Sequence, residues 1–156
     1  MDHHKKSISI ALIRKLGIEG WRWLAKWDER NHYFDFITSE CLEGESAREA
    51  ISREVAWELD VNRGRDILIC NMAQSNLNLF EVLPGDHHET ALKVAFYNVE
   101  LYRKQAVQKV NENGELAWLT SQEICDGQTH DKIAMNPKLT YLIQRSQVIQ
   151  HWESST

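Results

Sequence analysis

Hydrophobic and polar residues alternate in short runs through much of the chain. From Ser7 to Ile13, the residues Ile8, Ile10 and Leu12 fall on one face, and a period of two is typical of a β-strand. Trp21–Trp27 alternates in the same way after a glycine-bracketed turn, so these two runs are predicted to form a β-hairpin. Further strands are predicted at His32–Ile37, Asp66–Met72, Leu77–Val82, Leu92–Leu101 and Leu116–Leu119, with a hairpin turn at Asn113-Gly114.

Two segments have the period of a helix instead. Ser46 and Glu49 have the spacing of a capping box, and the apolar residues of Ala47–Asp60 then recur every four positions. Asn136 and Pro137 are typical of a second helix start, and this helix is predicted to run to Trp152. A further capping box, formed by Thr120 and Glu123, predicts a short helical turn between them. The order of elements predicts one α/β domain with a mixed sheet and two main helices, occupying 1–156 with a core at about 7–152.

Composition narrows the possible functions only slightly. The 156 residues carry a formal net charge of -5, which opposes a general nucleic-acid binder. No apolar run approaches the roughly 20 residues that span a bilayer, and the N-terminus lacks the features of a signal peptide. We therefore expect a cytoplasmic protein without nucleic-acid or membrane partners. His87-His88-Glu89 follows Pro84-Gly85-Asp86, which favours a solvated loop over a metal cluster.

Two glutamates of the first predicted helix are unusual in their position. At about 100° per residue, Glu54 and Glu58 fall inside the apolar arc, one turn apart. Like charges at this spacing repel each other, and a buried charge needs a partner. A divalent cation, a buried arginine or a water-filled cleft would each compensate them.

The same helix resembles the signature of the Nudix family, G-x5-E-x7-R-E-U-x-E-E-x-G-U, in which U is aliphatic. Glu45 is followed at the correct spacing by Arg53-Glu54-Val55, and both Glu58 and Val61 are in register. The later segment Glu115–Leu119, followed by Glu123-Ile124, is similar to the family's late strand and helix. The resemblance covers most of the chain and implies a Nudix-like α/β/α sandwich.

The box, which runs from Ser39 to Val61, departs from the signature in three places. Ser39 and Asp60 stand where the signature has glycines. Trp57 replaces the first glutamate of the Glu-Glu pair, which is a principal metal ligand in active members of the family. We predict that Trp57 is a packing residue; the alternative is that it stacks on a base or ribose.

The resemblance implies a metal-assisted attack of water on phosphorus. The substrate would be a nucleoside diphosphate linked to another group, or a similar organic pyrophosphate. Glu54 and Glu58 would be the catalytic residues and would hold Mg²⁺ or Mn²⁺, with Glu112 or Glu115 as a further ligand. Glu45 and Arg53 would form a structural ion pair within the box.

Two functions remain open at this stage. The first is a Nudix-type pyrophosphohydrolase, and the second is a catalytically impaired nucleotide-binding or regulatory module in which Trp57 has removed a metal ligand. In both, the expected partner is a small-molecule nucleotide or diphosphate, and a homodimer is an open alternative to a monomer. Trp21, Trp23 and Trp27 are predicted to be core residues, with an aromatic wall for a nucleobase as the alternative.

The cysteines generate a first testable prediction. Cys41, Cys70 and Cys125 are odd in number and lack metal-type spacing, so we expect three reduced thiols. Alkylation without reductant, followed by mass spectrometry of the intact chain, should add three labels per molecule. An intramolecular bridge in freshly purified protein would contradict this prediction.

Overall fold

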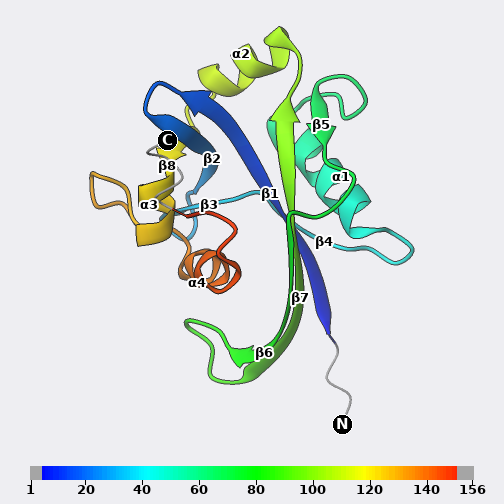
Figure 1. The fold of residues 1–156 in the computed structure, drawn as a ribbon, viewed down its shortest axis with the longest axis vertical. Coiled ribbons are helices and arrows are strands. Elements are labelled where there is room, and N and C mark those ends of the chain that lie inside the picture. Colours follow the sequence, from blue (N-terminus) through cyan, green and yellow to red (C-terminus); the bar gives the residue numbers. More distant parts are fainter. Residues whose placement is uncertain (1–4, 151–156) are drawn as a thin grey trace.

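The structure is a computed structural model that describes residues 5–150 (Figure 1). Its strands are β1 (Lys6–Gly17), β2 (Gly20–Asp28), β3 (Tyr33–Asp35), β4 (Thr38–Glu40), β5 (Ile67–Ile69), β6 (Ser75–Val82), β7 (Glu89–Leu101) and β8 (Leu116–Thr120). Its helices are α1 (Ala47–Leu59), α2 (Lys104–Glu112), α3 (Ser121–Asp126) and α4 (Pro137–Ser146). None of these helices has the length and apolarity required to cross a membrane.

The sheet is mixed, as predicted. Its main path runs β3-β2-β1-β7-β5, while β4 pairs with β1, β6 with β7 and β8 with β2. The pairing of β1 with β7 is parallel and joins Lys6 to Leu92 and Ile13 to Val99, whereas the other strand pairings are antiparallel. A parallel pair needs a long crossover connection, and here it contains α1 and most of the other strands.

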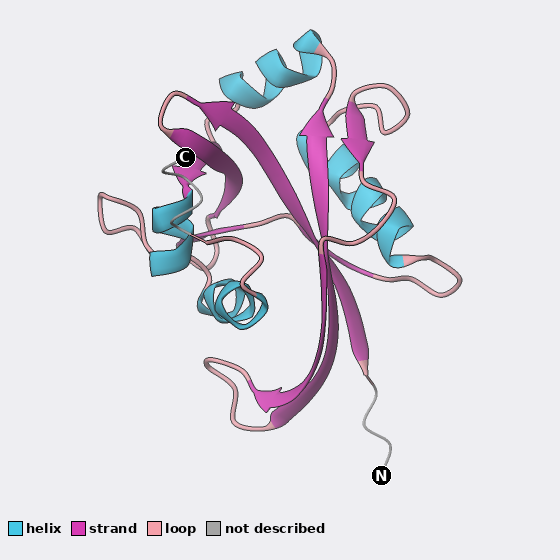
Figure 2. Cartoon of the chain, in the orientation of Figure 1, coloured by secondary structure: helices cyan, strands magenta, loops and turns pink. Residues whose placement is uncertain are grey.

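Two hydrophobic cores lie on opposite faces of this sheet. Along β1, Ile10 and Leu12 enter the core beneath α3 and α4, whereas Ala11 and Ile13 enter the core beneath α1. Figure 2 shows α1 on one side of the long central strands and α3 with α4 on the other. The predicted α/β/α sandwich is therefore confirmed, and β1 is buried on both faces, as a central strand between two helical layers must be.

The helix α1 begins and ends as its sequence predicts. The Ser46 hydroxyl accepts a hydrogen bond from the backbone N–H of Glu49 at 3.1 Å. At the other end, Asp60 adopts the left-handed conformation (φ 53°), which explains why the signature has glycine there. Lys109 of α2 contacts both the backbone carbonyl and the carboxylate of Asp60, so the residue that replaces glycine also links α1 to α2.

Three predictions of secondary structure need correction. The hairpin at Asn113-Gly114 is wrong, because the segment before it is α2, whose small buried face contains only Ala106 and Val110. The single strand predicted at His32–Ile37 is wrong in extent: β3 pairs with β2, and the chain then switches to pair as β4 with β1. The last helix ends at Ser146, earlier than predicted, and Trp152 lies outside the described residues.

Other predictions of detail agree with the structure. The Thr120 and Glu123 capping box is present at the start of α3. His87 and His88 lie in the connection between β6 and β7. No disulfide joins any two of the three cysteines, all of which lie in the described residues.

The contrast between the two sides of α1 gives a prediction for stability. Ile51 is fully buried on the inner face of α1, so Ile51→Ala should lower the free energy of unfolding by about 2–5 kcal/mol. Trp57→Ala, on the solvent side of the same helix, is the matched control and should change it by less than about 0.5 kcal/mol. Urea denaturation of the three proteins checks both values. Equal losses for the two variants would mean that the buried face of α1 is assigned incorrectly.

Candidate active site

The loop before α1 is held to the helix by one guanidinium group. Arg53 donates from Nε to Glu45 Oε2 at 2.9 Å and from Nη2 to Glu45 Oε1 at 3.1 Å. The Nη2 group also donates to Ser39 Oγ at 3.1 Å and to the Glu40 carbonyl at 3.2 Å. The hydroxyl of Ser39, where the signature has glycine, is thus part of this network. Arg53 and Glu45, the pair that the sequence predicted, join β4, the loop and α1 into one unit.

Glu54 and Glu58 lie together on α1 and are both largely shielded from water. Their side chains are 26% and 22% exposed, respectively. Burial raises the pKa of Glu54, and the neighbouring charge of Glu58 and a hydrogen bond to it raise that pKa further. Glu54 therefore holds a proton more tightly than a solvated glutamate does.

Basic side chains approach both carboxylates. Arg53 Nη1 lies 3.3 Å from Glu54 Oε2, and Lys26 Nζ of β2 lies 3.0 Å from Glu58 Oε1. Lys26 and Glu58 are far apart in the sequence, and the fold brings the long side chain of Lys26 from β2 to the C-terminal half of α1. The sequence left open whether a divalent cation, a buried arginine or a water-filled cleft compensates the two carboxylates. In the structure, each carboxylate has a basic partner, Arg53 for Glu54 and Lys26 for Glu58.

An acidic cavity of about 410 Å³ opens beside this pair. Lys26, Asp35, Glu58 and Glu115 line it, together with the half-buried indole of Trp27. Of the two candidate loop glutamates, the fold thus brings Glu115 to Glu58. It leaves Glu112 at the end of α2, where Gln108 donates a hydrogen bond to its carboxylate at 3.0 Å.

The three tryptophans of β2 have different environments. Trp23 is a core residue, 2% exposed, and its indole N–H donates to Ser121 Oγ at 2.9 Å. Trp21 packs against the edge of the same core. Trp27 instead forms part of the wall of the acidic cavity, with its ring edge-on to Phe34 at 5.2 Å between centroids. The prediction that these tryptophans are core residues is therefore confirmed for Trp23. Trp27 instead lines a cavity, which was the alternative prediction.

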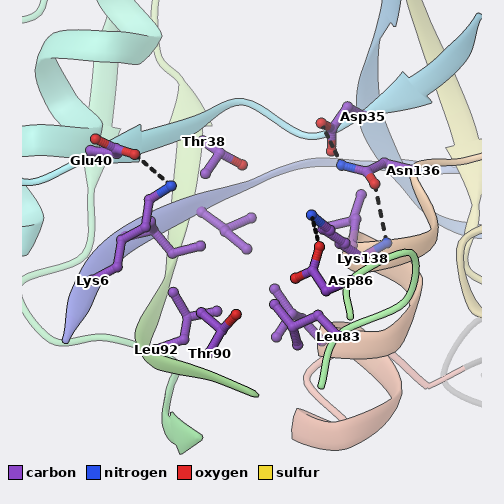
Figure 3. A pocket seen from close by; sticks show the side chains of 14 residues that line it. Lys6, Asp35, Thr38, Glu40, Leu83, Asp86, Thr90, Leu92, Asn136 and Lys138 are labelled. Carbon is purple, nitrogen blue, oxygen red and sulfur yellow. Dashed lines mark hydrogen bonds and ion pairs between the residues drawn. The ribbon is translucent and has the colours of Figure 1, made fainter. Parts of the chain in front are cut away.

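A second cavity, also of about 410 Å³, lies between the sheet and α4 (Figure 3). Two ion pairs stand at its edge, Lys6 with Glu40 at 2.6 Å and Lys138 with Asp86 at 3.0 Å. The inner lining is apolar, and it consists of Ile8, Ile10, Leu83, Leu92, Leu139 and Leu142. Asp35 and Thr38 line both this apolar cavity and the acidic cavity, so the two cavities adjoin at these residues.

Asp35 is the polar group at the junction of the two cavities. Its Oδ2 accepts a hydrogen bond from Asn136 Nδ2 at 3.0 Å (Figure 3). Its Oδ1 accepts a hydrogen bond from the Phe36 N–H at 2.9 Å. Burial raises the pKa of Asp35 to about 6, although both hydrogen bonds oppose that shift. Sequence reasoning missed both Asp35 and Lys26, and it identified Asn136 only as the start of a helix.

The structure overturns the prediction that Trp57 is a packing residue. Its side chain is 81% exposed on α1, one residue before Glu58. The place of the missing carboxylate is therefore not filled by a buried ring. Stacking on a ligand is the alternative that remains.

The remaining donor set suits a hard divalent cation. Mg²⁺ is commonly bound through one or two carboxylates, with water and substrate phosphates as the other ligands, and Glu54 with Glu58 offers two carboxylates in contact. Within residues 5–150, no group of three or more histidine, cysteine, aspartate or glutamate side chains is arranged to hold a metal. Further oxygen ligands would therefore come from a phosphate ligand or from water.

No protein-family model matches the sequence. A search of curated proteins also finds no match. Solved structures do match the fold. The Ap4A hydrolase of C. elegans shares 12% identity over 91% of this chain and 96% of its own, with a TM-score of 0.56. A mutT/nudix family protein from Listeria innocua shares 13% identity over 90% of both chains, with a TM-score of 0.57.

A third similar structure comes from a larger protein. NrtR of Shewanella oneidensis shares 12% identity over 90% of this chain but only 61% of its own, with a TM-score of 0.60. NrtR has also been solved in complex with a 27mer DNA. Together with the mutT/nudix structures, these similarities show that the chain has the Nudix hydrolase fold.

The pKa of Asp35 gives a prediction for stability against pH. The folded protein holds this proton up to about pH 6, whereas an ordinary aspartate releases it near 3.8. The contribution of Asp35 to the free energy of unfolding therefore falls as pH rises from about 4 to about 6, and it stays low above that range. Asp35→Asn removes this loss. The free energy of unfolding of the variant minus that of the parent should therefore rise by roughly 1–3 kcal/mol between about pH 4 and about pH 6.

Chemical denaturation between pH 4 and pH 8 measures this difference. Glu81→Gln is the matched control, because a hydrogen bond from Arg145 lowers the pKa of Glu81, and Glu81 lines neither cavity. Glu81 stabilises the fold more as pH rises to about its usual pKa of 4.5, so the difference between this control and the parent should fall up to about pH 5.5 and stay flat above it. A flat Asp35→Asn difference between pH 4 and pH 6 would contradict the raised pKa of Asp35.

Proposed function

We propose that this protein is a Nudix-type hydrolase of a nucleoside diphosphate linked to another group, or of a similar organic pyrophosphate. The observation that carries the proposal is the pair of glutamates, Glu54 and Glu58, which lie in contact and partly buried, with Glu58 lining the acidic cavity. The altered signature thus retains two carboxylates on one side of α1, and an acidic cavity adjoins them.

The residues of the acidic cavity would hold a diphosphate and a cation. Glu54 and Glu58 would bind Mg²⁺ or Mn²⁺, with Glu115 as the candidate for a further oxygen ligand. A bound ion would neutralise phosphate charge and lower the pKa of a water molecule for attack on phosphorus. Lys26 adds a positive charge in the same cavity, so it can pair with a phosphate oxygen as well as with Glu58.

The apolar cavity would hold the organic group attached to the diphosphate. Its apolar lining suits the face of a nucleobase, and Asp35 and Asn136 provide polar atoms at its inner edge. A small-molecule ligand fits a cavity of this kind and the net charge of -5 better than a nucleic-acid strand does. The names of the similar structures agree with this class of substrate, since one is an Ap4A hydrolase.

A second candidate function is a binding or regulatory module that has lost turnover. Two observations favour it. Trp57 stands exposed where the signature has a ligand carboxylate, and the Nζ of Lys26 already provides Glu58 with a positive partner at 3.0 Å. A site of this kind would bind a diphosphate but would activate water poorly.

Hydrolysis and binding assays on matched variants separate the two candidates. Hydrolase activity is measured on a panel of nucleoside diphosphate derivatives with Mg²⁺ or Mn²⁺, from the phosphate released after phosphatase coupling. We expect the parent to hydrolyse at least one of them, and Glu58→Gln to lower kcat/KM by about two orders of magnitude, as loss of a charge-stabilising group does. Glu112→Gln is the control and should retain full activity, since Glu112 lies outside both cavities.

Calorimetry with and without the metal gives the second readout. In either function, Mg²⁺ should tighten binding of a diphosphate ligand in the parent, and Glu58→Gln should remove most of that gain. Metal-dependent binding without turnover, with turnover appearing in Trp57→Glu, would establish the second function. If the parent shows neither turnover nor metal-dependent binding, both functions are wrong and the two glutamates are structural.

A further inference from the structure

Lys26 is the one basic side chain that lines the acidic cavity within the described part of the chain. Five carboxyl groups line the same cavity, and they belong to Asp28, Glu29, Asp35, Glu58 and Glu115. Carboxylates gathered in one cavity repel each other, so each needs a hydrogen-bond donor or a cation nearby. With one ammonium group among five carboxyl groups, the position of Lys26 decides where the negative charge of the cavity is offset.

The ammonium group of Lys26 lies against Glu58. Its Nζ is 3.0 Å from Glu58 Oε1, and it forms an ion pair with no other carboxylate of residues 5–150. Neutral donors serve three of the other carboxyl groups, namely Trp27 Nε1 for Glu29, Asn31 Nδ2 for Asp28 and Asn136 Nδ2 for Asp35. Lys26 therefore offsets the charge of the carboxylate that is in contact with Glu54.

The ion pair between Lys26 and Glu58 is partly shielded from water. The two side chains are 28% and 22% exposed, so solvent and salt screen their attraction less than that of a surface pair. The two residues are also held in place by separate elements, β2 and α1, which limits how far they can separate. The pair is therefore a stronger competitor for any third charged group than an exposed ion pair is.

This ion pair conflicts with a divalent cation at Glu54 and Glu58. Mg²⁺ binds carboxylate oxygens at about 2.0–2.1 Å, so an ion on Glu58 Oε1 would stand within about 5 Å of the Lys26 Nζ and be repelled by it. Trp57 offers no carboxylate in exchange. Lys26 must therefore leave Glu58 before that carboxylate can become a full metal ligand.

A phosphate group would give Lys26 another partner in the same cavity. A lysine ammonium is a compact charge on a flexible four-carbon stem with three donors, so it can turn from one oxygen to another while the backbone stays in place. A diphosphate presents several charged oxygens and competes with one carboxylate for the Nζ. Once the Nζ has turned to the phosphate, Glu58 is available to a cation that also binds that phosphate.

We propose that Lys26 is the resident counter-ion of Glu58, and that a phosphate group of the ligand releases Glu58 to the divalent cation by taking Lys26 as its own partner. Metal and ligand then strengthen each other's binding through Lys26, in addition to their direct contact, and the protein without ligand binds the metal weakly. This inference rests on the proposed function, since it takes Glu58 as a metal ligand. In the alternative, Lys26 only ties β2 to α1.

The first measurement is Mn²⁺ binding to the protein without ligand, followed by electron paramagnetic resonance of the free ion. Lys26→Met keeps a long side chain and removes its charge. This variant should bind Mn²⁺ about fivefold more tightly than the parent, which is the size of one moderate ion pair. Lys26→Arg retains the charge, so its Mn²⁺ affinity should stay within about twofold of the parent value.

The second measurement is the coupling between metal and phosphate. The probe is methylenediphosphonate, whose bridge resists hydrolysis, and calorimetry gives its affinity with and without Mn²⁺. The gain in affinity caused by Mn²⁺ should be about fivefold larger in the parent than in Lys26→Met, because coupling is reciprocal and the variant has lost the part that passes through Lys26. Chelation of Mn²⁺ by the free probe is the same for every protein and cancels from this comparison.

Two further variants support the comparison. Lys26→Gln repeats both measurements with a neutral side chain that still donates hydrogen bonds, and it should behave as Lys26→Met does. Lys109→Met is the matched control, because Lys109 also pairs with a carboxylate at α1, that of Asp60, but lines neither cavity. This control should behave as the parent does. Thermal melting checks that all variants fold.

The outcomes separate this inference from the proposed function. Neutral variants of Lys26 that bind Mn²⁺ no more tightly than the parent would show that Lys26 is only a structural partner of Glu58. An equal gain in Mn²⁺ affinity with and without the probe would show that Lys26 acts through its field and is not released by phosphate. Either result overturns the inference and leaves the hydrolase proposal standing. If the parent and every variant fail to bind Mn²⁺, alone or with the probe, the proposed function is contradicted and this inference falls with it.

Discussion

The site depends on the set of hydrogen bonds made by Arg53. One guanidinium group reaches the carboxylate of Glu45, the hydroxyl of Ser39, the backbone of Glu40 and the carboxylate of Glu54. A planar group with five donors can hold several acceptors in fixed directions at once, which a lysine ammonium cannot do. The loop, the edge strand β4 and the helix α1 therefore keep one relative position, and Glu54 keeps its orientation towards Glu58.

The two cavities meet where the chain changes partners between β3 and β4. At this crossover Phe36 and Ile37 enter the cores on opposite faces of the sheet, which anchors the turn from both sides. The flanking residues, Asp35 and Thr38, are then left facing the space that opens between the diverging strands, and both cavities share them. A buried aspartate is unfavourable in such a position unless its oxygens are occupied, and Asn136 occupies one while capping α4.

Sequence reasoning was most successful where local spacing determines geometry. The helical period placed Glu54 and Glu58 on the same partly buried side of α1, and the signature spacing paired Glu45 with Arg53. It failed where contacts depend on distant segments: Lys26 reaches α1 from β2, and nothing in its local sequence marks it. The prediction that Trp57 packs into the position of the missing carboxylate is wrong, because the direction of a side chain on a helix decides its exposure, and Trp57 is 81% exposed.

The parallel pairing of β1 with β7 also determines the order in which the protein can form during synthesis. The first strand is buried on both faces in the finished fold, yet its parallel neighbour begins at Glu89, more than half a chain later. At about 5–20 residues per second, a ribosome would take roughly 4–14 seconds to make the segment between the two strands. During that time β1 would present its apolar residues without the neighbour that covers one of its edges. Long-range pairing of this kind slows folding and lengthens exposure to aggregation, and until β7 has been made the pairings that can cover β1 are those with β2 and β4.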